Sequence, residues 1–293
     1  MTKEPSSNEN LKVQLPEPAT APIQPTRINT VDAEGQISSP RRSNLVSYLY
    51  TDVDPLQSSW PLAAYCFMTG YIDSVSFTAI FVWCGFQTGN SVQLALALAR
   101  LFQGPVGFRD TSFHIADQQA LTSLITFILG AFLGRIGNKM GDKTRAWLVL
   151  GTFIQALFTM AAAVTVWQSG QGSVADNRGN PSWTSALTFV AIGFMSASLG
   201  LQGIMGKRVN TQFATTIVLT TVWCELMADP KLFQLRHWVK TRDHKLIAVL
   251  SLFIGGFVGR ALIDKIGAAG TLGVGTGFRL LIALSWFFIP GKK

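Results

Sequence analysis

The sequence predicts an all-α integral membrane protein, a polytopic helical bundle with six spans, two short re-entrant half-helices and an inverted internal repeat. Its composition indicates a membrane protein, because only 14% of the 293 residues are charged and 48% are hydrophobic. A typical soluble domain has about 25% charged residues. The charged residues gather in the N-terminal segment and in short loops between apolar blocks. This separation argues against the one or two soluble domains that the length alone would allow.

Residues 1–43 are predicted to form a disordered cytoplasmic tail. Seven of the twelve prolines lie before residue 60, and large apolar residues are few before Leu45. Such a segment cannot bury enough apolar surface to offset the entropy lost on ordering. Because no apolar stretch of the signal-peptide type occurs near the start, no cleaved leader is expected. Residues 44–59 are expected to lead along the interface into the first span.

The transmembrane domain is predicted to cover residues 60–290. Six apolar blocks reach the roughly 20 residues needed to cross a ~30 Å hydrocarbon core. They are Trp60–Trp83, Gln119–Gly137, Arg145–Trp167, Trp183–Gly206, Leu246–Ile266 and Thr271–Pro290. Two further runs, Asn90–Phe102 and Thr216–Ala228, would give about 13 helical residues each, or roughly 20 Å. We therefore expect these two runs to be half-helices.

An internal repeat links the two short runs. The segment FILGAFLGR at Phe127–Arg135 returns as LFIGGFVGR at Leu252–Arg260, 125 residues later. The short runs then occupy corresponding positions in two halves, about residues 60–167 and 183–290. Paired short segments of this kind are the best sequence indication of a transporter-type binding site. Convergent packing remains an alternative, because small residues let membrane helices approach closely.

The positions of Lys and Arg favour six spans with both termini in the cytoplasm. With six spans, seventeen of the 24 basic residues lie on the cytoplasmic side, four lie outside and three lie within spans. With eight spans the division becomes fifteen to six. Cytoplasmic loops carry an excess of Lys and Arg, so six spans are preferred. Three spans per half would make the halves inverted repeats. The span lengths do not distinguish the plasma membrane from an endomembrane.

Polar residues inside the apolar segments are the candidate binding residues, because such groups usually face a bundle interior or a water-filled cavity. Asp73 lies in the middle of the first block, where it either forms a structural hydrogen bond or ion pair, or couples transport to protons or cations. Gln87, Thr88, Gly89 and Asn90 would form a polar turn before the first half-helix. The N–H groups there favour anionic or carbonyl ligands, although an ordinary N-cap remains an alternative.

The second half offers Thr220 and Arg279 as candidates. Thr220 belongs to a Thr-rich start of the second half-helix, where bonding of the hydroxyl to its own helix is the competing interpretation. Arg279 is the cation placed most deeply within a span. It could compensate Asp73 or Glu225, or it could bind an anionic solute.

Three segments resemble the YoaK-like family of bacterial and fungal multi-pass membrane proteins, a domain of unknown function. They are GYIDSVSF (residues 70–77), FQTGNSVQLAL (86–96) and GAFLGR (130–135). The lead-in at residues 51–73 is similar to the fungal branch. The resemblance runs from about Asp52 to the C-terminus and implies a membrane location without an established activity. A family element of the type Gly-Leu/Met-Gln-Asn reads Gly200-Leu201-Gln202-Gly203 here, which adds Gln202 to the candidate site.

Catalytic and metal signatures do not occur in the sequence. The three histidines lie in predicted loops without metal-ligand spacing, and no nucleophile elbow or P-loop is present. We therefore expect no enzymatic activity, no catalytic residues, no metal and no cofactor. The formal charge of +8 comes without a nucleic-acid-binding motif, so no nucleic acid partner is expected.

The sequence thus predicts a transporter or permease for a small polar or anionic solute, surrounded by the lipid bilayer. The sequence also allows the chain to form a homo-oligomer. The alternative is a non-transporting scaffold or accessory protein. It would recruit partners or anionic lipid through the tail and the basic loop Asp229–Lys245.

Overall fold

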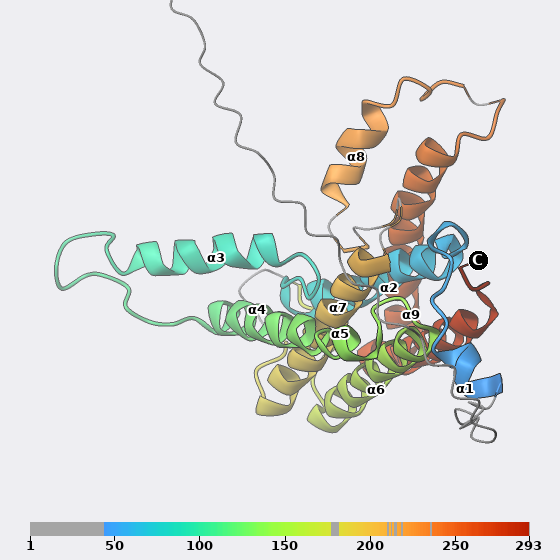
Figure 1. Ribbon diagram of the computed structural model, residues 1–293. Helices are drawn as coiled ribbons and strands as arrows, with labels where there is room; N and C mark the ends of the chain where they lie inside the picture. Colours follow the sequence, from blue (N-terminus) through green and yellow to red (C-terminus); the bar gives the residue numbers. More distant parts are fainter. Residues whose placement is uncertain are drawn as a thin grey trace, which may run out of the picture. The chain divides into compact units, whose positions relative to one another are not determined.

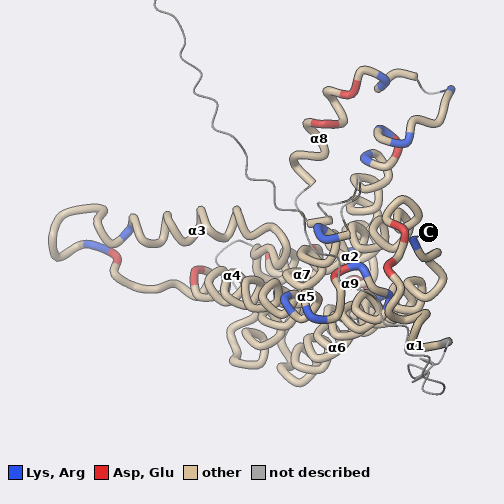
Figure 2. The backbone as a smooth tube through the Cα atoms, in the orientation of Figure 1, with Lys and Arg blue, Asp and Glu red and all other residues tan. Residues whose placement is uncertain are grey.

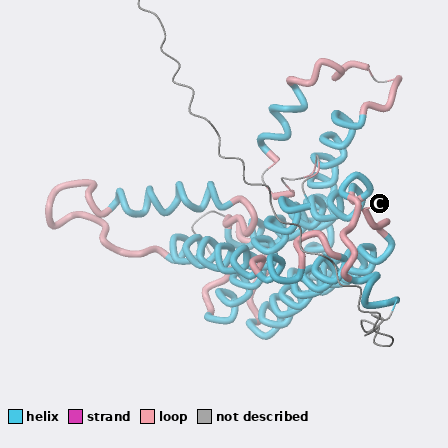
Figure 3. The backbone as a smooth tube through the Cα atoms, viewed as in Figure 1, coloured by secondary structure: helices cyan, strands magenta, loops and turns pink. Residues whose placement is uncertain are grey.

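The computed structural model describes residues 44–176, 182–209, 211, 213, 216–217, 219–234 and 236–292. The predicted tail therefore lies outside the described residues. The described part of the chain consists of helices joined by loops and contains no strand longer than an isolated bridge (Figures 1 and 3). Four stretches are long and apolar enough to cross a membrane: Ile115–Met140, Arg145–Ser169, Ala186–Val209 and Lys240–Phe288.

The helices follow one another along the chain, and the longer connections lie between α3 and α4, between α6 and α7, and between α8 and α9 (Figure 1). They are α1 (Asn44–Leu49), α2 (Ser59–Ile80), α3 (Gln87–Arg100), α4 (Ile115–Leu133), α5 (Ile136–Met140), α6 (Arg145–Ser169), α7 (Ala186–Val209), α8 (Thr220–Met227) and α9 (Lys240–Ser285). Single turns of 3₁₀-helix at Pro55–Gln57 and Trp286–Phe288 precede α2 and follow α9.

The predicted segments end where the backbone leaves the helical region. Helix α2 ends before Phe81, which has a left-handed φ of 56°, three residues before the predicted end. Helix α9 contains two predicted blocks, separated at Gly267 with φ 69° and ψ 175°. Only glycine adopts that conformation readily. Helix α8 begins four residues later than predicted, because its Thr-rich start has a low helix propensity.

One end of the bundle, which we call the basic end, holds the start of α6 and the ends of α7 and α9. The Arg208 guanidinium at the end of α7 donates to the Asp142 carboxylate at 2.8 Å, just before α6. The buried Arg145 guanidinium donates to the Ile289 carbonyl at 2.7 Å, just after α9. Arg145 also lies 4.1 Å from the centre of the Tyr48 ring in α1. The N-terminal lead-in and the C-terminal residues therefore meet here.

The opposite end lies about 37 Å away along the 25 residues of α6. The loop after α6 meets the end of α2 there, because the Ala175 amide donates to the Thr78 carbonyl at 3.0 Å. The same loop meets the break in α9, where the Ala268 amide donates to the Ser173 hydroxyl at 2.9 Å. Helices α2, α6 and each part of α9 thus run between the two ends.

Helix α2 packs closely along the first part of α9 through two glycines. A Cβ atom at Gly70 of α2 would overlap the Leu252 carbonyl oxygen. A Cβ atom at Gly255 of α9 would overlap the Phe67 carbonyl oxygen. Since both obstacles are backbone atoms, the helices could not keep this distance with larger residues.

Helices α4 and α7 repeat this contact. A Cβ atom at Gly200 would overlap the Phe127 carbonyl oxygen, and one at Gly130 would overlap the Ala197 carbonyl oxygen. The α7 residues lie 130 positions after their α2 counterparts, and the α9 residues lie 125 positions after their α4 counterparts. The first helix of each predicted half therefore packs against a helix of the other half in the same way.

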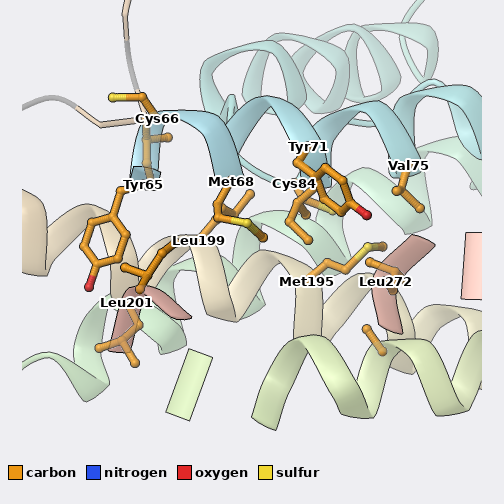
Figure 4. Close-up of a cluster of buried hydrophobic side chains, with 14 of the residues drawn as sticks. Tyr65, Cys66, Met68, Tyr71, Val75, Cys84, Met195, Leu199, Leu201 and Leu272 are labelled. Carbon is orange, nitrogen blue, oxygen red and sulfur yellow. The ribbon is translucent and has the colours of Figure 1, made fainter. Parts of the chain in front are cut away.

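The centre of the bundle is filled by side chains of α2, α7 and α9. In Figure 4, Met68 and Tyr71 of α2 point toward α7, which contributes Met195 and Leu199, and Leu272 of α9 lies beside them. All five side chains are completely buried. The polar groups described next lie among these apolar contacts.

Candidate functional site

The guanidinium of Arg279, in the second part of α9, is completely buried. Its Nη1 atom donates to the side-chain carbonyls of Gln155 in α6 and Gln202 in α7, the latter at 3.1 Å. Its Nη2 atom donates to the Ser198 hydroxyl at 3.3 Å, and its Nε atom has no hydrogen-bond partner within the described ranges. All of these acceptors are neutral. The ion pairs of the described residues do not include Arg279.

Further hydrogen bonds extend this cluster to α2. The Gln202 side-chain amide donates to the Tyr65 carbonyl and to the Thr69 hydroxyl, both at 2.9 Å. The Thr69 hydroxyl lies 2.9 Å from the Thr216 carbonyl, and the Tyr65 hydroxyl lies 2.6 Å from the Thr152 hydroxyl. We call the cluster the arginine layer; its side chains are those of Tyr65, Thr69, Thr152, Gln155, Ser198, Gln202 and Arg279.

The arginine layer carries a positive charge that no acidic side chain of the described residues compensates. Removing an ion from water costs several kcal/mol even after the protein relaxes. Hydrogen bonds to a charged group return about 1.5–3 kcal/mol each. The three acceptors offset much of this cost, but the charge itself remains. This charge would favour an anion, or the negative end of a polar molecule, beside the guanidinium.

Asp73 lies in a different polar cluster. Its Oδ1 atom accepts hydrogen bonds from the Cys84 and Gly85 amides, both at 2.8 Å, and its Oδ2 atom has no hydrogen-bond partner among the residues that the structure describes. The side chain is 1% exposed. The carboxylate thus fastens the turn between α2 and α3. The structural hydrogen bond that we considered is present, whereas Asp73 and Arg279 form no ion pair.

Gln87 and Asn90 point inward from the start of α3. The Gln87 amide donates to the Ser123 hydroxyl of α4 at 2.9 Å, and the Asn90 amide donates to the Trp83 carbonyl at 2.7 Å. The Ser123 hydroxyl also lies 2.9 Å from that of Ser196 in α7. These contacts join the start of α3 to helices of both predicted halves.

Thr88, Gly89 and Thr220 face outward. Thr88 and Gly89 are exposed and line a groove of about 580 Å³ between the end of α2 and α3. Its other lining residues are Phe77, Phe81, Trp83, Val92, Gln93 and Leu96. Thr220 is exposed at the first residue of α8. The candidate residues therefore separate into the arginine layer, the Asp73 cluster and two outer positions.

Several polar residues of these clusters were not predicted from the sequence. The sequence did contain an indication of Gln155. In the alignment of the two halves, Gly151-Thr152 corresponds to Gly275-Thr276 at an offset of 124, and Gln155 then aligns with Arg279. Nothing in the sequence indicated Ser123 or Ser198, because a single serine in an apolar helix is common. Within the described ranges, no group of three His, Cys, Asp or Glu side chains is arranged to hold a metal ion.

The comparison with protein families found one model, described as a protein of unknown function (DUF1275), that matches residues 62–285. The chain belongs to this family. The match runs from Leu62 in the first turn of α2 to Ser285 at the end of α9, and it confirms the resemblance to the YoaK-like proteins. The assignment to a fungal branch stays a prediction. No curated protein and no solved structure matches the chain. In this DUF1275 protein, the site must therefore be argued from its own geometry.

Two substitutions of Asp73 distinguish the contribution of its hydrogen bonds to stability from the contribution of its negative charge. Asp73→Ala removes the acceptor of two buried amides, so we expect the free energy of unfolding to fall by about 2 kcal/mol or more. Asp73→Asn keeps an oxygen at Oδ1 and should change it by no more than about 1 kcal/mol. Both can be measured by denaturation in detergent micelles. Equal losses in the two variants would contradict the hydrogen-bonding role.

Proposed function

We propose that the protein crosses the membrane six times, with α2, α4, α6, α7 and the two parts of α9 as its spans. The outer faces of these helices expose large apolar side chains, such as Phe132 (59%), Phe253 (70%) and Phe257 (69%), which suit contact with lipid. Helices α3 and α8 have 14 and 8 residues, too few to cross a ~30 Å core, and are proposed to be re-entrant.

We further propose that the two halves are inverted repeats. The matching glycine contacts at constant offsets support the repeat. Helix α2 starts at the basic end, whereas its counterpart α7 finishes there, so the two run in opposite directions. The basic end carries Lys139 in α5, Lys143 just before α6, and Lys207 and Arg208 in the last turn of α7. The positive-inside rule therefore favours a cytoplasmic location for this end and for both termini.

We infer that the arginine layer is the binding site of a transporter or permease for a small anionic or polar solute. The proposal rests on the observation that Arg279 is completely buried and has no carboxylate partner in the part of the chain that the structure describes. Transporters with inverted repeats bind their substrates near the bilayer midplane, where the repeats meet. Arg279 and Gln155 occupy corresponding positions of the two halves and contact each other, as a site on the repeat axis requires.

The test is anion flux through purified protein in liposomes. Vesicles would be assayed for chloride, nitrate, acetate and phosphate in turn, with protein-free vesicles as the reference. We expect flux above the reference for at least one of these anions. If none of them moves and none stabilises the protein against heat, the anion transporter is excluded for these probes. The scaffold alternative would then be favoured.

A further inference from the structure

The two short helices form hairpins whose tips carry exposed aromatic side chains. Helix α3 continues into a loop at residues 101–114 before α4, and α8 continues into a loop at residues 228–239 before α9 (Figures 1 and 3). Phe108 on the first tip is 87% exposed. On the second tip, Phe233 is 88% exposed and Trp238 is 70% exposed. Helix packing leaves these rings without a cover among the described residues.

The α8–α9 tip has a defined conformation, because the Arg242 side chain, near the start of α9, donates hydrogen bonds to its backbone. This side chain is buried, and its guanidinium donates to the carbonyls of Lys231 (2.9 Å), Gln234 (2.7 Å) and His237 (3.1 Å). The Asp243 carboxylate pairs with the same guanidinium at 2.6 Å. The loop is therefore fastened at three points, and its side chains are presented outward.

The two tips differ in charge. The α8–α9 tip exposes Lys231 and Arg236, and Lys240 is exposed at the start of α9. In Figure 2, the backbone between α8 and α9 carries blue segments, which mark Lys and Arg. One acidic residue, Asp229, accompanies these three cations. The α3–α4 loop instead balances its charges, with Arg109 beside Asp110, whose carboxylate lies 2.6 Å from the His114 imidazole. Aromatic residues are thus common to both tips, whereas an excess of positive charge is not.

We propose that the α8–α9 tip binds anionic phospholipids of the cytoplasmic leaflet. Phe233 and Trp238 would lie at the headgroup level, where amphipathic rings are enriched. Lys231, Arg236 and Lys240 contact the lipid phosphates and carboxylates, and each basic residue near an anionic surface adds to the attraction. The proposal rests on the membrane orientation given above and not on transport, so it can fail or hold independently of anion flux.

The test uses the full-length protein in mixed detergent–lipid micelles, with phosphatidylserine or phosphatidylcholine as the added lipid. Phosphatidylserine should raise the unfolding temperature, and phosphatidylcholine should not. The triple variant Lys231→Gln/Arg236→Gln/Lys240→Gln should need at least ~10-fold more phosphatidylserine for the same rise. The matched control Arg109→Gln, on the other tip, should behave like the natural protein. Raising the salt concentration should weaken the effect, because screening shortens the range of surface charges.

Three results would overturn the proposal. An equal effect of both lipids would show that the aromatic rings anchor the tip without regard to charge. An undiminished response of the triple variant would place the phosphatidylserine site elsewhere. A dimer that is lost in the triple variant, seen by mass measurement without any lipid effect, would show that the tip binds a second copy of the chain.

Discussion

Arg279→Met should abolish anion flux while leaving the protein folded. Removing one partner of a buried charge pair costs about 3–5 kcal/mol, so an anion held by Arg279 should bind roughly 10²- to 4 × 10³-fold more weakly. The free energy of unfolding is affected much less, because the substitution has two effects of opposite sign. The variant loses three hydrogen bonds to a charged group but no longer buries an uncompensated cation. We expect the free energy of unfolding to change by no more than about 2 kcal/mol.

The matched control is Arg260→Met in the same helix. Arg260 is about half exposed and pairs with Asp264 one turn later, so the variant should keep its anion flux and its stability. Flux in reconstituted vesicles and thermal unfolding in micelles would be measured on both variants. A normal flux in Arg279→Met would remove the arginine layer as the binding site. Unfolding of Arg279→Met with loss of flux would assign Arg279 to structure.

The sequence predicted the helices well because membrane spans depend on length and polarity, which are read directly from the residues. The predicted ends were wrong by a few residues where the backbone conformation of a single residue ends the helix. Phe81 takes a left-handed conformation without a glycine signal. The break in α9 was located better, because Gly267 falls in the four-residue gap that the sequence left between two predicted blocks. The internal repeat was visible because Gly130 and Gly255 occur in similar nine-residue segments. That the same glycines form the closest helix contacts required the structure.

The sequence indicated candidate residues by their type, but it did not indicate which of them lie together in the structure. Polar residues in apolar blocks are rare, so Asp73 and Arg279 could be identified one by one, whereas Gln202 was added through the family resemblance. Their partners depend on how helices pack. Asp73 binds amides eleven and twelve residues later, across the turn after α2. Arg279 binds a residue 124 positions earlier, and only the repeat alignment indicated that contact.

The close helix contacts predict the largest losses of stability, at Gly255→Ala and Gly130→Ala. In each, the added methyl group would meet a backbone carbonyl of the facing helix, at Phe67 and Ala197 respectively, so whole helices must separate. Overpacking usually costs 1–3 kcal/mol. Since no side chain can move aside here, we expect a loss of at least about 3 kcal/mol, a large part of the 5–15 kcal/mol of a typical protein.

Gly277→Ala provides the control, because nothing lies within 4 Å of a Cβ atom at this position of α9. Alanine is the better helix former, so this variant should be unchanged or more stable by up to about 1 kcal/mol. Unfolding in micelles would be followed for all three variants. Similar losses at Gly130 and Gly255 are required if the two contacts are equivalent parts of a repeat. Tolerance at one position and failure at the other would show that the halves pack by different rules, and the inverted repeat would lose its main support.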